Sequence, residues 1–95
     1  MAAYVILEVE TTDPATMAAY REAAPPSIAV HGGRYLVRGG AVESLEGGWN
    51  PERIVVLEFD SVERAKAWWD SAEYREPKLL RRAAGRSRTI IVEGV

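Results

Sequence analysis

The sequence contains no cysteine, which excludes disulfides, thiolate metal sites, iron–sulfur clusters and cysteine nucleophiles. It also lacks any apolar run near the roughly 20 residues that a membrane helix needs. The opening residues, Met1 to Glu8, have neither the basic segment nor the small-residue cleavage site of a secretory signal. We therefore expect a cytoplasmic protein with no membrane partner.

Histidine is almost absent as well, since His31 is the only one. One histidine among scattered carboxylates offers neither a paired-histidine metal motif nor an acidic calcium loop, so no metal or cofactor is expected. The glycine pairs at 32–33, 39–40 and 47–48 do not link a strand to a helix as a phosphate-binding loop does. A net charge of -2, with no aromatics interleaved among the basic residues of 75–88, argues against nucleic acid.

What the chain does have is the composition of one folded domain over residues 1–95. Of its residues 47% are hydrophobic and 27% charged, which is too apolar for disorder. A domain this small buries only about 60 to 65% of the surface of its unfolded chain. A second copy of the chain is therefore an expected partner.

An internal repeat organises the sequence. Residues 5–11, Val-Ile-Leu-Glu-Val-Glu-Thr, match residues 55–61, Val-Val-Leu-Glu-Phe-Asp-Ser, almost position for position. Each β-branched run predicts a strand, and a helix start follows each. Asp13 is a natural N-cap with Pro14 after it, and Ser61 caps the second helix. Both halves therefore begin as a strand followed by a helix.

The proline, serine and glycine residues that mark helix and strand boundaries complete a βαββαβ order. We expect the first helix to kink or break at Pro25-Pro26 and to end at Gly32-Gly33. The second helical region is expected to restart at Ser71 or Pro77 and to end at Gly85. The other strands are expected at 33–38, 53–59 and 89–93. The fold class is α+β and ferredoxin-like, with a four-stranded, mixed antiparallel-type sheet whose first and third strands lie side by side and parallel, and with helices on one face.

Strand alternation predicts which face the helices cover. The parity of Val5, Leu7 and Leu57 is the more apolar and should lie under the helices. The other face, left bare, is too apolar for a monomer, so two sheets should pack face to face in a dimer. Tryptophan in the hairpin loop suits an interface anchor or a pocket lid. The dimer-interface candidates are Ile6, Glu8, Ile54, Val56 and Trp49.

Parallel pairing of the repeats would set Glu8 and Glu58 on the bare face, about 5 Å apart. Arg38 can offset their repulsion if it shares that face; otherwise one glutamate should keep its proton at raised pH. An interface ion-pair network is favoured over an acid/base pair.

A ligand could lie in a cleft between the helices and the sheet. Tyr20, Trp69 and Tyr74 could form aromatic walls with hydroxyl groups, with Arg38 and Glu58 as charged partners. Core packing is the preferred interpretation of the aromatics. Trp68 is expected to be hard to bury within one chain. The catalytic candidates are Glu58 and His31; for His31, a role at the end of a helix is favoured over that of a base.

Several segments together resemble a known family over essentially the whole chain. They include Gly33-Arg34-Tyr35-Leu36-Val37-Arg38-Gly39-Gly40, Trp49-Asn50-Pro51-Glu52-Arg53, Ala67-Trp68-Trp69-Asp70-Ser71-x-x-Tyr74 and Arg86-Ser87-Arg88. These segments look like the bacterial domain-of-unknown-function family numbered thirteen-thirty. The resemblance implies a dimeric α/β barrel, in which two ferredoxin-like sheets face each other across a homodimer.

The resemblance supplies no reaction. Relatives in that superfamily include cofactor-free monooxygenases, lactone isomerases, haem-degrading enzymes and ligand-sensing domains, so the fold alone cannot choose among them. We expect a homodimer that binds a small metabolite. If it is an enzyme, cofactor-free oxygenation or isomerisation is the class to test, with Glu58 or His31 as base and Arg38 stabilising an enolate-like anion. The alternative is a non-catalytic structural or regulatory dimerisation module.

Overall fold

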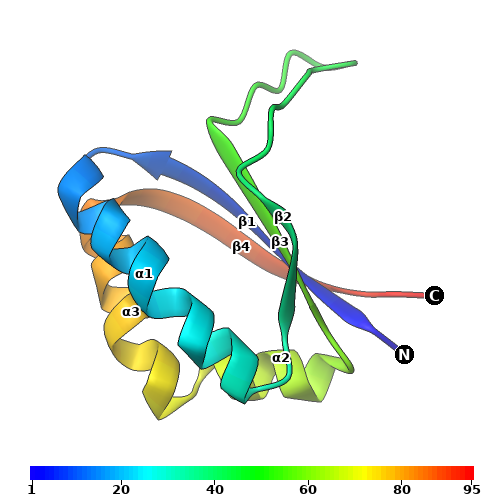
Figure 1. Cartoon of the computed structure of the whole chain (residues 1–95). Helices are drawn as coiled ribbons and strands as arrows, with labels where there is room; N and C mark the ends of the chain where they lie inside the picture. Colours follow the sequence, from blue (N-terminus) through cyan, green and yellow to red (C-terminus); the bar gives the residue numbers. More distant parts are fainter.

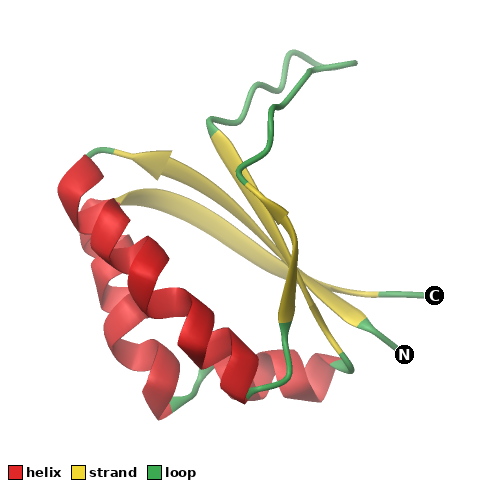
Figure 2. Ribbon diagram, viewed as in Figure 1, coloured by secondary structure: helices red, strands yellow, loops and turns green.

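The two repeated apolar runs form the central strands of a four-stranded sheet in the computed structural model, which describes residues 1–95 (Figure 1). Three helices lie on one face of that sheet, and the other face is bare (Figure 2). The elements are β1 (Ala3–Thr11), α1 (Pro14–Val30), β2 (Arg34–Arg38), β3 (Arg53–Phe59), α2 (Val62–Trp69), α3 (Ala72–Ala84) and β4 (Gly85–Glu93). The expected ferredoxin-like order is confirmed, with the second helical region divided in two.

The strands are arranged β2-β3-β1-β4, and every neighbouring pair is antiparallel. The prediction that β1 and β3 are central neighbours is confirmed, but the prediction that they run parallel is wrong. The connection through α1 returns the chain to its starting end, so β1 and β2 point the same way. A hairpin then reverses β3 relative to β2, and β3 lies between them. Antiparallel pairing of β1 with β3 follows from the connections.

The predicted alternation of faces is confirmed. Val5, Leu7 and Leu57 are each no more than 2% exposed and pack under the helices, while their sequence neighbours lie on the bare face. Each fully buried aliphatic side chain stabilises the fold by about 1.5 to 3 kcal/mol.

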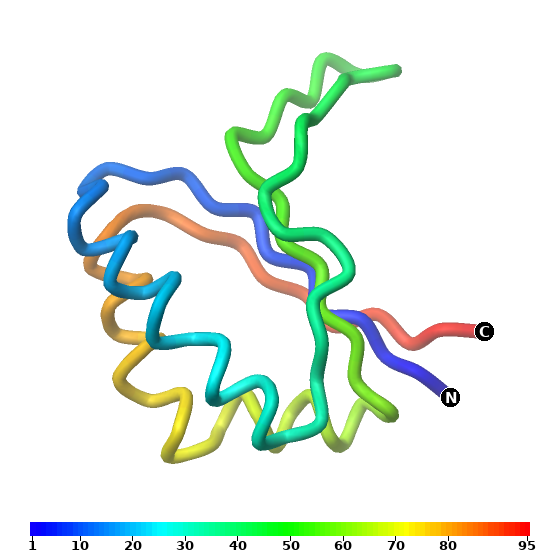
Figure 3. The backbone as a smooth tube through the Cα atoms, in the orientation of Figure 1, coloured from blue at the N-terminus to red at the C-terminus, as the bar shows by residue number.

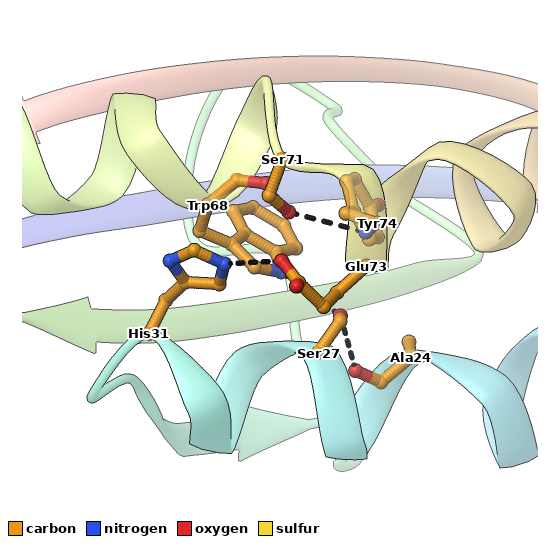
Figure 4. A network of polar contacts seen from close by, with 7 residues as sticks. All are labelled: Ala24, Ser27, His31, Trp68, Ser71, Glu73 and Tyr74. Atoms are coloured by element: carbon orange, nitrogen blue, oxygen red, sulfur yellow. Dashed lines mark hydrogen bonds and ion pairs between the residues drawn. The ribbon is translucent and has the colours of Figure 1, made fainter.

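Trp68, expected to be hard to bury, is fully buried, so that prediction is wrong. It lies one turn beyond the buried Ala65, and its ring centroid is 5.5 Å from Phe59 and 4.0 Å from Tyr74. Its indole N–H donates to Ser27 Oγ at 3.1 Å, and Ser27 in turn donates to the Ala24 carbonyl at 2.7 Å (Figure 4). The fold back into α3 covers Trp68 and leaves Trp69 only partly buried.

Helix α1 is continuous through Pro25 and Pro26, so the predicted break is also wrong. Asp13 caps its first turn, as expected, by accepting from the Thr16 amide at 3.2 Å. Pro25 has no N–H for the carbonyl four residues earlier, that of Arg21. The Arg38 guanidinium donates to that carbonyl at 2.8 Å, which offsets part of the cost of the proline.

The later boundaries agree with one of two alternatives and correct another element. Ser71 caps α3 by accepting from the Tyr74 amide at 3.1 Å, whereas Pro77 lies inside the helix. Strand β4 begins at Gly85 rather than Thr89, because its first residues pair with the end of β1.

Residues 39–52 form a long hairpin loop without strands, which projects beyond the end of the sheet (Figure 3). Trp49, in this loop, is 58% exposed, and its indole N–H donates to Glu8 on the bare face at 2.7 Å. No helix in the structure is both long and apolar enough to span a bilayer.

Candidate functional site

A cavity lies on the helix side of the sheet, between α1 and strands β1, β2 and β3. Aliphatic side chains form its floor, and two tyrosines and three arginines complete its wall. Its volume is about 20 Å³, which is room for about one water molecule. The lining residues are Leu7, Val9, Met17, Tyr20, Arg21, Ile28, Tyr35, Arg38, Arg53, Val55 and Leu57.

A β-bulge in β2 turns Arg38 toward this cavity. Tyr35 pairs with Leu57, but the next paired residue is Val37, opposite Val56, so Leu36 is the extra residue. Strict alternation from Tyr35 would send Arg38 to the bare face. The bulge shifts the alternation by one, and Arg38 instead lies opposite Val55 on the helix side.

Arg38 meets two other arginines there, one from α1 and one from the start of β3. Arg21, Arg38 and Arg53 line the cavity with no carboxylate among its lining residues, and none of the three makes an ion pair within 4.0 Å. Partial burial, followed by repulsion from Arg21 and Arg38, lowers the pKa of Arg53. The Arg38 guanidinium also lies over the Tyr35 ring, 4.5 Å from its centroid.

The cavity wall leads into a buried chain of polar groups. The hydroxyls of Tyr20 and Tyr74 are 2.8 Å apart, and Arg81 Nε donates to the Tyr74 hydroxyl at 3.3 Å. Arg81 is itself only 2% exposed. Burial, reinforced by Tyr74, raises the pKa of Tyr20 far above its ordinary value. Tyr20 therefore stays a neutral phenol at any physiological pH.

Of the four predicted ligand-binding residues, two line the cavity and two do not. Tyr20 and Arg38 do, whereas Tyr74 lies in the core behind Tyr20. Trp69 lies farther off, with the Lys78 ammonium 4.5 Å from its ring centroid, beside a hollow lined by Arg81, Arg82 and Arg86. Tyr20, Trp69 and Tyr74 therefore do not line one cleft, because Tyr74 fills the space between the other two rings.

Neither predicted base reaches this cavity. Glu58 lies on the bare face and forms an ion pair with Arg34. His31 ends α1, and its Nε2 is 2.8 Å from Glu73 Oε1 of α3, so the two side chains point toward each other (Figure 4). That contact joins two helices and leaves both side chains outside the cavity.

Glu8 and Glu58 share the bare face, as expected, but they are not neighbours. Antiparallel register puts Glu8 opposite Ile54 and Glu58 opposite Tyr4, about 13 Å apart along the strands. Hydrogen bonds from Trp49 and then from Arg88 lower the pKa of Glu8. The expectation of a raised glutamate pKa is thus wrong for Glu8, whose partners are cationic or donating groups.

The bare face carries an apolar row flanked by charge. Cross-strand pairing lines up Val37, Val56, Ile6 and Ile90 across all four strands. Ile90 is 56% exposed and Val37 40% exposed. On one side of the row Arg34 pairs with Glu58, and on the other Arg88 pairs with Glu8 at 2.6 Å.

Sequence reasoning missed Arg21, Arg53 and Tyr35 at the cavity. Arg38 ends β2 and Arg53 begins β3, so the sequence already placed both at the loop end of one hairpin, although the structure pairs Arg38 with Val55. Nothing local marks Arg21, which reaches the site only because α1 packs over β2.

The whole chain resembles known proteins in sequence and in structure. A family model described as Domain of unknown function (DUF1330) matches residues 2–95. No curated protein matches the sequence. A solved protein of unknown function from Rhodopseudomonas palustris has a TM-score of 0.78 at 21% identity, over 99% of this chain and 82% of that one.

Two further solved structures share the architecture. Putative antibiotic biosynthesis monooxygenases from Nitrosomonas europaea and Chloroflexus aurantiacus each have a TM-score of 0.59 at 16% identity. The matches cover 100% of this chain and 99% and 96% of theirs. At such identity the likeness establishes the ferredoxin-like fold and nothing about chemistry.

Proposed function

The chain belongs to the DUF1330 family, and we propose that it binds a small, partly aromatic or acidic metabolite in the cavity between α1 and the sheet. One observation carries the proposal: an aliphatic floor meets convergent polar groups, Tyr20, Tyr35 and Arg38, in a single concavity. Small-molecule sites have this composition, with apolar walls and a few placed polar groups.

Binding requires the cavity to open, since about 20 Å³ admits little more than water. Its movable parts are the side-chain ends of Arg21, which is exposed, and Arg53, which is partly buried. Arg53 folds over Gly39, whose φ of +71° suits glycine and where a β-carbon would collide with the guanidinium. Displacing these long side chains enlarges the cavity without moving the backbone.

The buried polar chain supports a donor role for Tyr20. Arg81 can only donate, so the Tyr74 oxygen accepts from it; either hydroxyl can donate in the contact between Tyr74 and Tyr20, and in the proposed direction Tyr74 donates to the Tyr20 oxygen. That direction leaves the Tyr20 proton for a ligand in the cavity that its side chain lines.

Cofactor-free oxygenation or isomerisation is the catalytic form of the proposal. The cavity lining holds no carboxylate or histidine, so the substrate itself must be acidic enough to form its anion. Arg38 and the Tyr20 hydroxyl would stabilise that anion as it develops. The two solved relatives named as putative monooxygenases make oxygenation the first reaction to assay, although they share only the fold.

We also propose that the bare sheet face pairs with a second copy, which is the whole function if the chain is a structural or regulatory dimerisation module. The apolar row centred on Ile6 and Val56 supports this assembly, because burying it removes several aliphatic side chains from water. The flanking pairs Glu8–Arg88 and Glu58–Arg34 give each copy both signs of charge for its partner.

Native mass spectrometry of the gently purified protein tests both proposals. A dimer with a reproducible additional mass that Arg38→Gln removes supports a ligand in the cavity. A clean dimer favours the dimerisation module. A monomer contradicts the pairing of the bare faces.

A further inference from the structure

We infer that the three arginines bind the carboxylate of a small organic acid whose apolar part lies on the aliphatic floor; this inference rests on the proposed binding function and specifies its ligand class. Arg21, Arg38 and Arg53 come from three different elements and meet at one cavity. Like charges brought together repel, and such an arrangement is stable when an anion occupies it.

No protein carboxylate fulfils that role. Glu52 is the acidic side chain that shares an outer hollow with Arg21 and Arg53. Its Oε2 accepts from the Thr11 amide at 2.6 Å, and it makes no ion pair with either arginine. Glu52 therefore holds the hairpin loop against β1 and leaves the arginines without a counter-ion from the chain.

The local geometry already aims Arg38. One of its terminal nitrogens is fixed on the Arg21 carbonyl at 2.8 Å, and its plane lies over Tyr35. A guanidinium has five N–H donors, so the others remain available for a carboxylate. Fixing the group before the ligand arrives reduces the entropy that binding must overcome.

The floor distinguishes an organic acid from inorganic anions. Met17, Ile28 and Leu57 form it, and all are buried. A carboxylate on an apolar ring or chain satisfies the arginines and the floor together, whereas phosphate would have to lose its water against aliphatic groups. A planar carboxylate also matches the guanidinium fork.

The experiment is a titration of the full-length protein, followed by two-dimensional NMR, with sodium benzoate and with benzamide as its neutral counterpart. We expect benzoate to bind at least tenfold more tightly, with shifts centred on Tyr35, Arg38 and Met17. Charge-assisted hydrogen bonds typically account for a difference of this size. Inorganic phosphate should displace benzoate only at a much higher concentration.

Arg53→Gln and Arg38→Gln should each weaken benzoate binding about tenfold and leave benzamide unchanged. Arg75→Gln, at an exposed position on α3 away from the cavity, is the matched control and should not alter either affinity. The Arg53 side chain makes no hydrogen bond or ion pair within the protein, unlike that of Arg38, so Arg53→Gln is not expected to unfold the chain.

The outcomes separate the two proposals. Equal binding of benzoate and benzamide in the cavity overturns the carboxylate inference while the binding function stands. Tighter binding of phosphate, or benzoate shifts confined to residues 75–88, also overturns it. If neither probe nor any other fragment of similar size shifts the cavity residues, the binding function fails, and this inference fails with it.

Discussion

Arg38 of β2 donates a hydrogen bond of 2.8 Å to the backbone carbonyl of Arg21, which Pro25 leaves without its helical donor. One guanidinium therefore compensates for a proline inside α1 and contributes a positive charge to the cavity. The β-bulge at Leu36 makes this possible, because it turns Arg38 to the helix side of the sheet.

Replacing Arg38 with alanine is expected to destabilise the fold by about 1 kcal/mol, the net value of a lost hydrogen bond. Urea unfolding followed by circular dichroism measures the change, with Arg75→Ala as the control at an exposed helix position. The oligomeric state should not change, because Arg38 faces the helices. A dimer lost in Arg38→Ala would contradict the orientation described here.

Ser27→Ala is expected to destabilise the protein by about 1 to 3 kcal/mol, because it leaves the buried Trp68 indole N–H without its acceptor. Trp68→Phe removes the donor, so adding Ser27→Ala to it should cost much less than Ser27→Ala alone. Ser44→Ala, in the exposed hairpin loop, is the control. Additive free energies of unfolding for the two core changes would disprove the coupling.

Stability is expected to fall as the pH drops below about 4.5, the ordinary pKa of a glutamic acid. The hydrogen bond from His31 lowers the pKa of Glu73, so the unfolded chain takes up the proton first and stability rises with pH across that window. Glu73→Gln should flatten this part of the stability profile. Glu76→Gln, on the same helix without such a contact, should not. Equal slopes in both variants would contradict the assignment.

At alkaline pH the dependence reverses, and stability is expected to fall as the pH rises. Burial raises the pKa of Tyr20, so its contribution to stability is complete below pH 10, the ordinary value, and is lost as the pH rises further and the unfolded phenol ionises. Tyr20→Phe should reduce this alkaline loss and weaken benzoate binding, since the donor is gone. Urea unfolding at a series of alkaline pH values measures the loss of stability, and absorbance titration of the phenols measures the pKa of Tyr20. A Tyr20 that ionises near pH 10 in the folded protein would refute it.

Ile6→Lys is expected to convert a dimer to a folded monomer, because it puts a charge at the centre of the apolar row on the bare face. Sedimentation equilibrium gives the mass, and circular dichroism reports the fold. Ile90→Lys, at a position already 56% exposed, gives a second test with less risk to folding. Leu79→Lys, 54% exposed on α3, is the control and should remain dimeric. A dimer that survives both sheet changes would exclude this interface.

The elements and the burial pattern were available from the sequence because they depend on local chemistry. The repeat at residues 5–11 and 55–61 predicts two strands, the caps Asp13, Ser61 and Ser71 begin the helices, and period-2 alternation separates the buried face from the bare one. The family resemblance, carried by motifs along the whole chain, was also readable at this level.

The direction of β3 against β1, and with it the separation of Glu8 from Glu58, depended on how the connections cross the sheet. Arg38 changed faces because one unpaired residue in β2 shifted the alternation, which no local pattern marks. Trp68 became core because α3 folds back over α2. The arginine cluster exists only because α1, β2 and β3 meet. Strand, cap and alternation are properties of neighbouring residues, whereas a binding site is made of residues far apart in sequence that only tertiary packing brings together.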